Sequence, residues 1–190
     1  MLSFREVGTD DAELIRAWRS KERVSVNMNT DLNNTAAQQK AWIVSKQSDS
    51  TYYHWIIQAA EKDIGLVYLS DIDGKGKTTS WGFYIGDDNY LGLGGFVPLY
   101  LYSFVFRGLN LTSILAEVLY YNVDVVQMHL QHGYIFCPRM DHVIDKRGEN
   151  VLVIGMALNR DRFINSRYDR FNVNLPWEQW EANPFNVGDR

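Results

Sequence analysis

The sequence predicts an α+β fold in which a mixed, mostly antiparallel central sheet is flanked by helices. Three observations predict it: two capping boxes begin helices near the amino terminus, three strand-like segments follow in a row, and later strands enclose one more helix. With 190 residues, 46% of them hydrophobic, the chain can bury a core of its own. We assign residues 1–158 to one domain, and residues 159–190 to an appendage packed on that domain or on a partner.

The composition excludes several classes of protein. With 19 Lys and Arg against 23 Asp and Glu, the net charge of -4 gives no attraction to nucleic acid or to an anionic membrane. The single cysteine, Cys137, excludes an internal disulfide and a cysteine-built metal site, and the histidines lack metal-ligand spacing. No segment reaches the roughly 18 apolar residues of a membrane span, and no apolar run marks a signal peptide. We expect a metal-free cytoplasmic protein without nucleic-acid or membrane partners.

The amino-terminal part predicts one strand and two helices. Residues 2–7 alternate in polarity, which is typical of a strand. A capping box with Asp10 as the N-cap begins the first helix. A second capping box, with Thr35 as its N-cap, begins a helix that turns Trp42 and Ile43 inward.

Three antiparallel strands follow. Residues 52–59 are aromatic and β-branched, and residues 64–72 and 78–85 continue the same pattern. Gly74 and Gly76 can supply the positive φ angles of the hairpin turn between the last two strands.

The glycine-rich segment after these strands is the most informative part of the chain. Gly94 and Gly95 precede the uncharged residues 96–106, and Pro98 fits the first turn of a buried helix that begins just after either glycine. A helix start offers free N–H groups and a positive dipole end, so this arrangement favours a bound phosphate or pyrophosphate. The alternative is a turn that only lets the helix pack tightly. No Lys follows the glycines as in nucleoside triphosphatases, and the preceding strands are not the parallel unit of a dinucleotide fold.

The following residues complete the sheet. Glu117 is the one charged residue in the strand predicted at 112–119. Asn122 can cap the next helix, and Gly133 can end it. Two further strands, joined by a turn at 145–148, are predicted at residues 134–140 and 151–158.

Four segments in this order resemble the GNAT superfamily of N-acetyltransferases: residues 17–19, 80–86, 91–95 and 122–134. Within the superfamily, the chain is most similar to enzymes that acetylate the 4-amino group of a nucleotide-linked sugar in pseudaminic acid synthesis. It is also similar to ribosomal-protein and polyamine acetyltransferases.

The resemblance implies acetyl-CoA as the cofactor. Its pyrophosphate would lie on the main-chain amides of residues 91–95, and its pantetheine arm would run beside residues 83–85. Asn122 matches the asparagine that contacts this arm, and Asn89 stands where the family pattern has Gln or Arg. The expected cofactor-binding residues are Phe83, Tyr84, Ile85, Asn89, Leu91, Gly92, Leu93, Gly94, Gly95 and Asn122.

Acetyl transfer to an amine needs a base, a donor for the developing oxyanion and a donor for the leaving thiolate. The resemblance implies the backbone N–H of Phe83 or Tyr84 as the oxyanion donor. His129 occupies the family's tyrosine position near the CoA sulfur, where an imidazole titrating near neutrality can donate. Glu117 is the expected base or the holder of a water molecule, with partial burial tuning its carboxylate. The alternatives are a histidine on a helix surface and a glutamate that faces solvent.

Four residues are substrate candidates: Arg19, Met28, Gln39 and Trp42. Arg19 can pair with a substrate phosphate. Met28 and Trp42, together with Tyr84, can form an apolar wall for a sugar methyl group or a uracil. Gln39 fills a position that is often His in the amino-sugar enzymes. For each residue the alternative is core packing or ordinary solvation.

Three functions remain open from the sequence. The first is acetyl transfer from acetyl-CoA to the amine of a small molecule, with a nucleotide-linked amino sugar as the leading acceptor. The second changes the acceptor to a ribosomal-protein α-amine or a polyamine, and a polyamine site needs acids such as Asp71, Asp73, Asp87 and Asp88 to face the cleft. The third is an acyl-CoA-binding protein without turnover. A homodimer is a candidate assembly.

Overall fold

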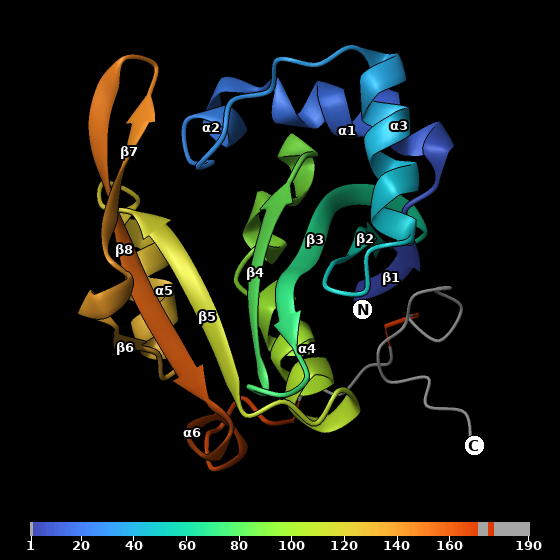
Figure 1. Ribbon diagram of the computed structural model, residues 1–190. Helices are drawn as coiled ribbons and strands as arrows, with labels where there is room; N and C mark the ends of the chain where they lie inside the picture. The colour runs from blue at the N-terminus through green and yellow to red at the C-terminus, as the bar shows by residue number, and fades with distance from the viewer. Residues whose placement is uncertain (1, 171–174, 177–190) are drawn as a thin grey trace.

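The computed structural model describes residues 2–170, 175 and 176. In this part of the chain, eight strands form one sheet in the order β1-β2-β3-β4-β5-β8-β6, and β7 pairs with β8 as well. Every pairing is antiparallel except that of β4 with β5. Helices flank the sheet, so the predicted fold class is confirmed (Figure 1).

The sheet has two halves. The amino-terminal half is an antiparallel meander of β1 (Leu2–Glu6), β2 (Tyr53–Ala59), β3 (Lys62–Asp73) and β4 (Thr78–Ile85). The second half consists of β5 (Ser113–Leu119), β6 (Ile135–Phe136), β7 (His142–Lys146) and β8 (Glu149–Asn159).

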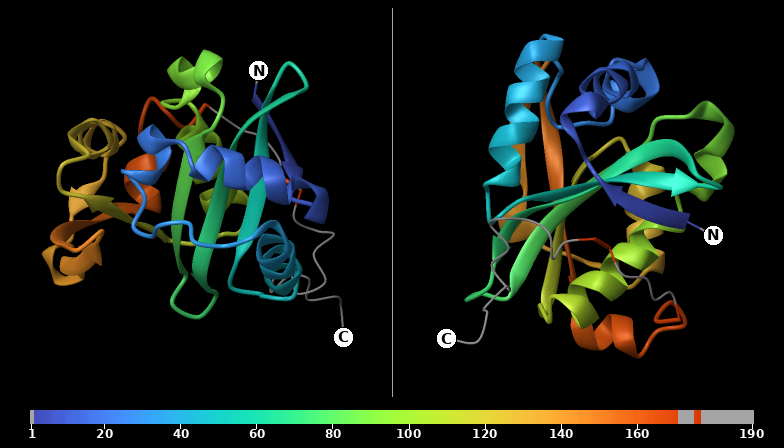
Figure 2. Two further views of the ribbon diagram at one scale, coloured as in Figure 1. Left: turned by 90° about the horizontal axis from the view of Figure 1, so that it is seen from above. Right: turned by 90° about the vertical axis from the view of Figure 1, so that its right-hand side faces the viewer.

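Helices cover both faces of the sheet (Figure 2). One face, which we call the α1 face, carries α1 (Ala12–Arg19), α2 (Glu22–Ser25) and α3 (Ala36–Gln47). The opposite face, the α4 face, carries α4 (Val97–Ser103) with the π-helical turn Phe104–Gly108, α5 (Val123–Gln131) and α6 (Arg160–Ile164).

The core is divided by the sheet into two apolar layers. On the α4 face, Trp55, Tyr102 and Phe106 are fully buried, and on the α1 face so are Ile43 and Ile56. Because burial of one such side chain contributes about 1.5–3 kcal/mol, the helices are fixed on both sides of the sheet mainly by these contacts.

The first helix begins differently from the prediction. A 3-10 turn, Thr9–Asp11, precedes α1, and the amide of Gly8 donates to the Asp11 carboxylate at 2.8 Å. Asp11 also pairs with Arg5 of β1 at 2.7 Å, whereas Asp10 is exposed. The predicted capping box at Asp10 is therefore wrong, because a tertiary ion pair selects the next carboxylate.

The second capping box is confirmed. The amide of Gln38 donates to Thr35 Oγ1 at 3.2 Å, and the amide of Thr35 donates to Gln38 Oε1 at 2.8 Å. The helix buries Ile43 as predicted, but Trp42 is 37% exposed and lies edge-on to Tyr52. The inward orientation predicted for Trp42 is wrong, since its ring lies at the edge of a cavity described below.

Residues of the β3–β4 hairpin adopt positive φ angles at other places than predicted. Asp71 has a φ of 52° and Lys77 a φ of 53°, whereas Gly74 and Gly76 do not adopt positive φ. The register shifts between Ser70 and Asp73, which marks a β-bulge. The positive φ angles expected at the two glycines are therefore found in the bulge and at the end of the turn.

The last part of the sheet is shorter than predicted at residues 134–140. Only Ile135–Phe136 pair with β8, because the 3-10 turn Pro138–Met140 follows and its proline has no N–H for a ladder. The turn predicted at residues 145–148 is present, with φ angles of 56° at Arg147 and 84° at Gly148, but it joins β8 to β7, a strand that was not predicted.

The described residues after 158 pack on the domain. Phe163 of α6 is fully buried, and Leu175 is 1% exposed. Trp55 Nε1 donates to the carbonyl oxygen of Pro176 at 2.6 Å. The domain boundary at residue 158 stays a prediction, and residues 171–174 and 177–190 of the appendage lie outside the described part.

Candidate active site

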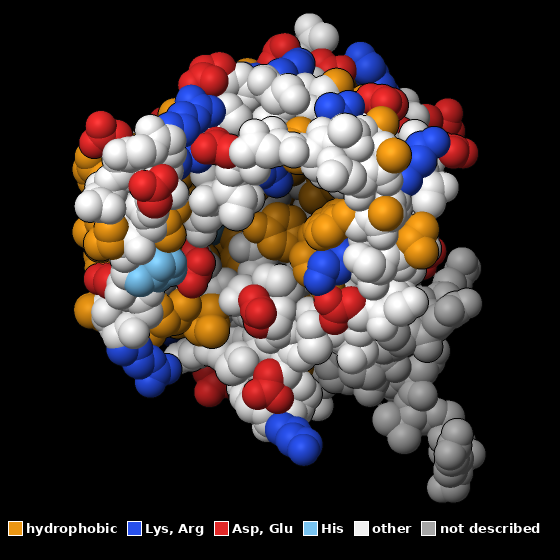
Figure 3. Space-filling model, turned by 45° about the horizontal axis from the view of Figure 1, so that its top comes forward, with side chains coloured by type: hydrophobic (Ala, Val, Ile, Leu, Met, Phe, Trp, Pro, Cys, Tyr) orange, Lys and Arg blue, Asp and Glu red, His pale blue; other side chains and the backbone are white. Residues whose placement is uncertain are grey.

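A cavity opens where β4 and β5 separate. The two strands pair over only three register positions, from Thr78 with Ser113 to Ser80 with Leu115. Beyond Ser80 they diverge around a cavity of about 620 Å³, seen as a hollow lined with hydrophobic side chains in Figure 3. The edge of β4 from Trp81 onward is not paired with β5, so its backbone groups remain available to a ligand.

The cavity passes from one face of the sheet to the other. Its α1 end is formed by α1, the segment 27–34, α3 and the side chains of β3 and β4 that point to the α1 face. Its α5 end is formed by Phe83, Asn122, Val125 and His129. Two ligands can therefore approach the same point from opposite faces.

All four substrate candidates line the α1 end: Arg19, Met28, Gln39 and Trp42. Arg19 donates from Nη2 to the carbonyl oxygen of Thr30 at 2.8 Å, while its Nε is buried without a partner. Gln39 is 4% exposed and accepts from Asn34 Nδ2 at 2.7 Å. The α1 end thus holds a guanidinium among amides.

Three tyrosines complete the α1 end, and sequence reasoning found only Tyr84 of them. The rings of Tyr52 and Tyr68 stack at 5.7 Å, and the Tyr84 hydroxyl is buried without a partner. Burial raises the pKa of all three phenols, so they stay protonated at neutral pH. The two-residue alternation of strands puts Tyr68 and Tyr84 on one face, but nothing local in the sequence shows that this face borders a cavity.

His129 lies at the α5 end, between two aromatic rings. It is 3% exposed, its ring is stacked on Tyr134 at 4.6 Å, and Trp81 lies at 5.6 Å. Burial lowers the pKa of His129 to about 3, so the expected titration near neutrality is wrong. Its Nδ1 is buried without a partner. Because orphaned buried N–H groups are rare, we assign the proton to Nε2, which leaves a neutral donor.

Glu117 extends from β5 on the α1 face and lines the cavity. It is exposed, so the expected partial burial is wrong. Asn29 Nδ2 donates to Glu117 Oε2 at 3.4 Å, and Glu117 forms no ion pair with any residue of the described chain. Glu117 and His129 therefore border the cavity from different faces of the sheet.

The loop after β4 is held by its own acids. Asp87 accepts from the amide and from Nδ2 of Asn89, each at 2.9 Å, and pairs with Lys62 at 2.8 Å. The hydrogen bond from Lys62 is the largest cause that lowers the pKa of Asp87 to about 2. Asn89 is exposed and shapes the loop rather than lining the cavity.

The glycines of this loop present bare main chain. A Cβ added at Gly92 or Gly95 would meet nothing within 4 Å. The amide of Gly94 bonds to the carbonyl oxygen of Leu91 at 3.0 Å, whereas the amide of Gly95 has no backbone acceptor among the described residues. The helix begins at Val97 with its proline in the first turn, as predicted. Of the expected loop residues Leu91 lines the cavity, whereas Gly92, Leu93, Gly94 and Gly95 do not.

Asn122 stands at the N-cap position of α5, but its side chain makes no capping hydrogen bond. The predicted N-cap position is therefore confirmed, but the capping hydrogen bond of its side chain is not formed. Since Asn122 lines the cavity, its amide remains free for a ligand. The buried side of α5 is carried by Val125, Val126 and His129.

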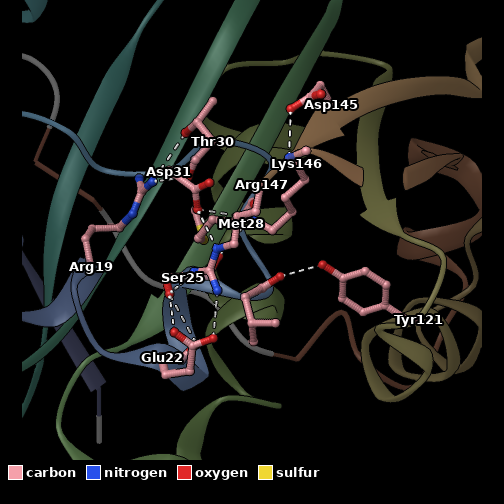
Figure 4. Close-up of polar contacts among 12 residues, drawn as sticks. Arg19, Glu22, Ser25, Met28, Thr30, Asp31, Tyr121, Asp145, Lys146 and Arg147 are labelled. Carbon is pink, nitrogen blue, oxygen red and sulfur yellow. Dashed lines mark hydrogen bonds and ion pairs between the residues drawn. The ribbon is translucent and has the colours of Figure 1, made fainter. Parts of the chain in front are cut away.

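The second half of the sheet holds the segment 25–31 over the cavity through Lys146 (Figure 4). Lys146 is 6% exposed, and its Nζ donates to the carbonyl oxygens of Ser25 at 3.0 Å and Met28 at 2.6 Å. It also lies 3.4 Å from the Asp31 carboxylate.

Two further side chains reinforce this contact. Tyr121 Oη donates to the carbonyl oxygen of Val26 at 2.6 Å, and Arg147 pairs with Glu22 at 2.8 Å. We call Tyr121, Lys146 and Arg147 the hairpin clasp, because they join the β5 end and the β7–β8 hairpin to the wall of the α1 end.

Residues 4–151 match the family described as Acetyltransferase (GNAT) domain. The chain belongs to this family. A search of curated protein sequences finds no match. Among solved structures, the acetyltransferase is similar to spermidine N-acetyltransferase from Vibrio cholerae in complex with CoA and spermine, with 17% identity and a TM-score of 0.79 over 86% of this chain and 98% of that chain. It is also similar to a dodecameric structure of the Vibrio cholerae enzyme in an intermediate state, with 16% identity and a TM-score of 0.73 over 86% and 96% of the chains.

Family membership makes this protein an acetyl-CoA-dependent N-acetyltransferase, as predicted. The likeness to the solved structures shows the shared fold. The narrower resemblance to the amino-sugar enzymes of pseudaminic acid synthesis stays a prediction. In residues 2–170, 175 and 176, no helix is long and apolar enough to cross a membrane, and no three His, Cys, Asp or Glu side chains are placed to hold a metal ion.

The residues present fit acetyl-CoA. The main chain at Gly92 and Gly95 is open to a diphosphate, the Asn122 amide is free, and the unpaired edge of β4 can bond the amides of a pantetheine arm. When bound, acetyl-CoA supplies a thioester-activated acetyl group. These side-chain and main-chain roles are the ones that the resemblance implies, and they stay predictions for each residue.

The arrangement provides a separate place in the cavity for each of the three chemical requirements of acetyl transfer. Successive N–H groups of a strand point to opposite edges. One of Phe83 and Tyr84 therefore directs its N–H toward the gap where β4 and β5 separate, which we call the split, and can stabilise a developing oxyanion. His129 can donate to a thiolate from the α5 end. Glu117 can accept an amine proton on the α1 face, directly or through water. The amine then enters from the α1 end.

Proposed function

We propose that this acetyltransferase acts on the primary amine of a small acceptor that also carries an anionic group, and that the acceptor class is a nucleotide-linked 4-amino sugar. The observation that carries the proposal is Arg19. Its Nε is buried without a partner at the α1 end, and it forms no ion pair within the described residues. A guanidinium in this state suits the oxygens of a phosphate.

The other walls of the α1 end support the same acceptor. Trp42, Tyr52 and Met28 offer flat or apolar surfaces for a base or a sugar methyl group, and Gln39 and Asn34 offer amides for ring substituents. These side chains recognise a ring without requiring that it be charged.

Two of the acids that a polyamine site was expected to need, Asp87 and Asp88, do not line the cavity and already form ion pairs. Asp87 pairs with Lys62 and Asp88 pairs with Lys21, each at 2.8 Å. The acids that a polyamine site would need therefore do not act as free charges at this loop.

A polyamine is the second candidate acceptor. Asp71 and Glu117 line a small cavity of about 100 Å³ next to the main one, and neither forms an ion pair with another described residue. Two carboxylates at this place can attract a distal ammonium group. The solved spermidine N-acetyltransferases have the same fold, which adds to this alternative.

The test measures thiol release from acetyl-CoA with a UDP-linked 4-amino hexose, spermidine and an amino-terminal peptide. We expect turnover with the nucleotide sugar. Substitution R19M should raise its KM about 10-fold to 100-fold, because a charge-assisted hydrogen bond contributes about 1.5–3 kcal/mol. The exposed Arg139 has no side-chain partner in the described chain, so R139M serves as the matched control. Turnover of spermidine alone, unaffected by R19M, would establish the second candidate instead.

A further inference from the structure

Tyr68 occupies a special position in the sheet. It belongs to β3, points to the α1 face and stands directly opposite Gly82 of β4 in the register. It lines both the main cavity and the small cavity beside it. No other tyrosine of the described chain borders both cavities.

The Tyr68 ring lies across β4. A Cβ added at Gly82 would come within 2.6 Å of Tyr68 Cζ and 2.8 Å of Cε1, and the hydroxyl is the atom that it would meet first. Contacts this short do not occur in proteins, so only glycine admits the ring at this place. The ring therefore brings its hydroxyl over the strand whose far edge is unpaired, at the split between β4 and β5.

The Tyr68 hydroxyl is available for a ligand. It makes no hydrogen bond to any residue that the structure describes, whereas a hydroxyl has one donor and two acceptor positions. The charged groups that act on it are Arg19, Glu117 and Asp71. Burial is the largest cause that raises the pKa of Tyr68, so the phenol stays protonated and neutral at physiological pH.

We propose that Tyr68 is a catalytic residue of the acetyl transfer, whose hydroxyl accepts a hydrogen bond from the acceptor amine and holds its lone pair toward the split. In this transfer a C–N bond forms to the acetyl carbon and the C–S bond breaks. The amine proton passes to Glu117 or its water, and CoA leaves as the thiolate. Tyr68 itself neither gains nor loses a proton. The inference rests on acetyl transfer to a primary amine and holds for either acceptor class.

Substitution Y68F tests the proposal, because it removes the hydroxyl and keeps the ring stacked on Tyr52. We expect kcat to fall about 100-fold, as misplaced reacting groups typically cost this much. The melting temperature and the Kd of CoA should not change. Tyr120 is 54% exposed and lies outside both cavities, so Y120F is the matched control.

A second experiment separates a chemical role from a structural one. G82A should displace the Tyr68 ring and reduce kcat as Y68F does, but it should cost little more when added to Y68A, where no ring is left to displace. Additive effects of G82A and Y68A on kcat, or a wild-type kcat for Y68F, would overturn the proposal. Both are measured with whichever amine the wild type consumes, so a wrong acceptor assignment does not affect the result.

Discussion

At the scale of single residues, His129 shows how burial changes what a side chain can do. A buried imidazole that stays neutral cannot act by giving up a charge near pH 7, but its Nε2–H can stabilise a thiolate. Tyr134 and Trp81 fix the ring plane, so the donor direction is set before any ligand binds. The donor role of His129 stays a prediction, now for a neutral imidazole.

Substitution H129F should lower kcat about 100-fold, the typical loss for one positioned donor, without lowering the melting temperature. Stability should hold because the phenyl ring replaces a buried nitrogen that has no partner. Between pH 5.5 and 8, the pH profile of kcat should have the same shape in the wild type and in H129F. An inflection near pH 6.5 that disappears in H129F would contradict the neutral imidazole.

At the scale of elements, the glycine loop and the hairpin clasp lie in separate parts of the molecule. The loop offers open main chain at Gly92 and Gly95, and the clasp fixes the segment 25–31 at the α1 end of the cavity. The two can be perturbed separately, since no bond described above joins them.

Substitution G95V should raise the Kd of CoA at least about 10-fold, because a branched side chain would cover the amides that a diphosphate needs. The fold should tolerate it, since a Cβ at this position meets nothing within 4 Å. Gly74, in a turn with the same open surroundings, provides the matched control G74V. Calorimetry with CoA measures both, and equal affinities would exclude the loop as the diphosphate site.

Substitution K146M should loosen the wall of the α1 end, because it leaves the carbonyl oxygens of Ser25 and Met28 without their buried donor. We expect faster hydrogen exchange in residues 25–31 and a KM for the acceptor raised about 10-fold, with an unchanged Kd for CoA. Lys40 is exposed and has no side-chain partner in the described chain, so K40M is the control. Unchanged exchange in residues 25–31 would mean that Lys146 does not hold them.

How far each element could be predicted depends on the distance of its contacts along the chain. The capping box at Thr35 was predictable because both hydrogen bonds lie within three residues. The start of α1 was not, because Arg5 of β1 selects Asp11 over Asp10. The clasp was missed for the same reason, since Lys146 lies 118 residues from Met28 and no local pattern marks a lysine that will be buried.

In the candidate site, the positions of residues were predicted better than their burial and contacts. Most of the predicted site residues line the cavity, because the family resemblance carries positions such as His129, Asn122 and Arg19, but most of the residues that line it were not predicted. The state of each residue was not predicted either, since the burial of His129, the exposure of Glu117 and the missing capping hydrogen bond at Asn122 follow from packing. Tyr68 was missed because its role depends on a glycine in another strand.

At the scale of the whole molecule, three buried histidines couple the fold to pH. Burial is the largest cause that lowers the pKa of His54 and His129 to about 3 and that of His132 to about 4, below the usual value near 6.5. The unfolded chain therefore binds more protons than the folded one at pH values between these folded-state pKa values and about 6.5. The resulting stability is fully present above about pH 6.5 and is lost as the pH falls toward the folded-state values.

The free energy of unfolding should accordingly fall as the pH is lowered below 6.5, by up to about 1.4 kcal/mol per pH unit for each of these histidines. Urea titrations at pH 7, 6 and 5 measure the slope. In H129F the slope should be smaller by one histidine's share, because a phenyl ring cannot take up the proton. His142 is exposed on β7, so H142F serves as the control for replacing a surface histidine by phenylalanine. Equal slopes for wild type and H129F would show that His129 is not held neutral by burial, and with it the donor proposed for the thiolate would lose its basis.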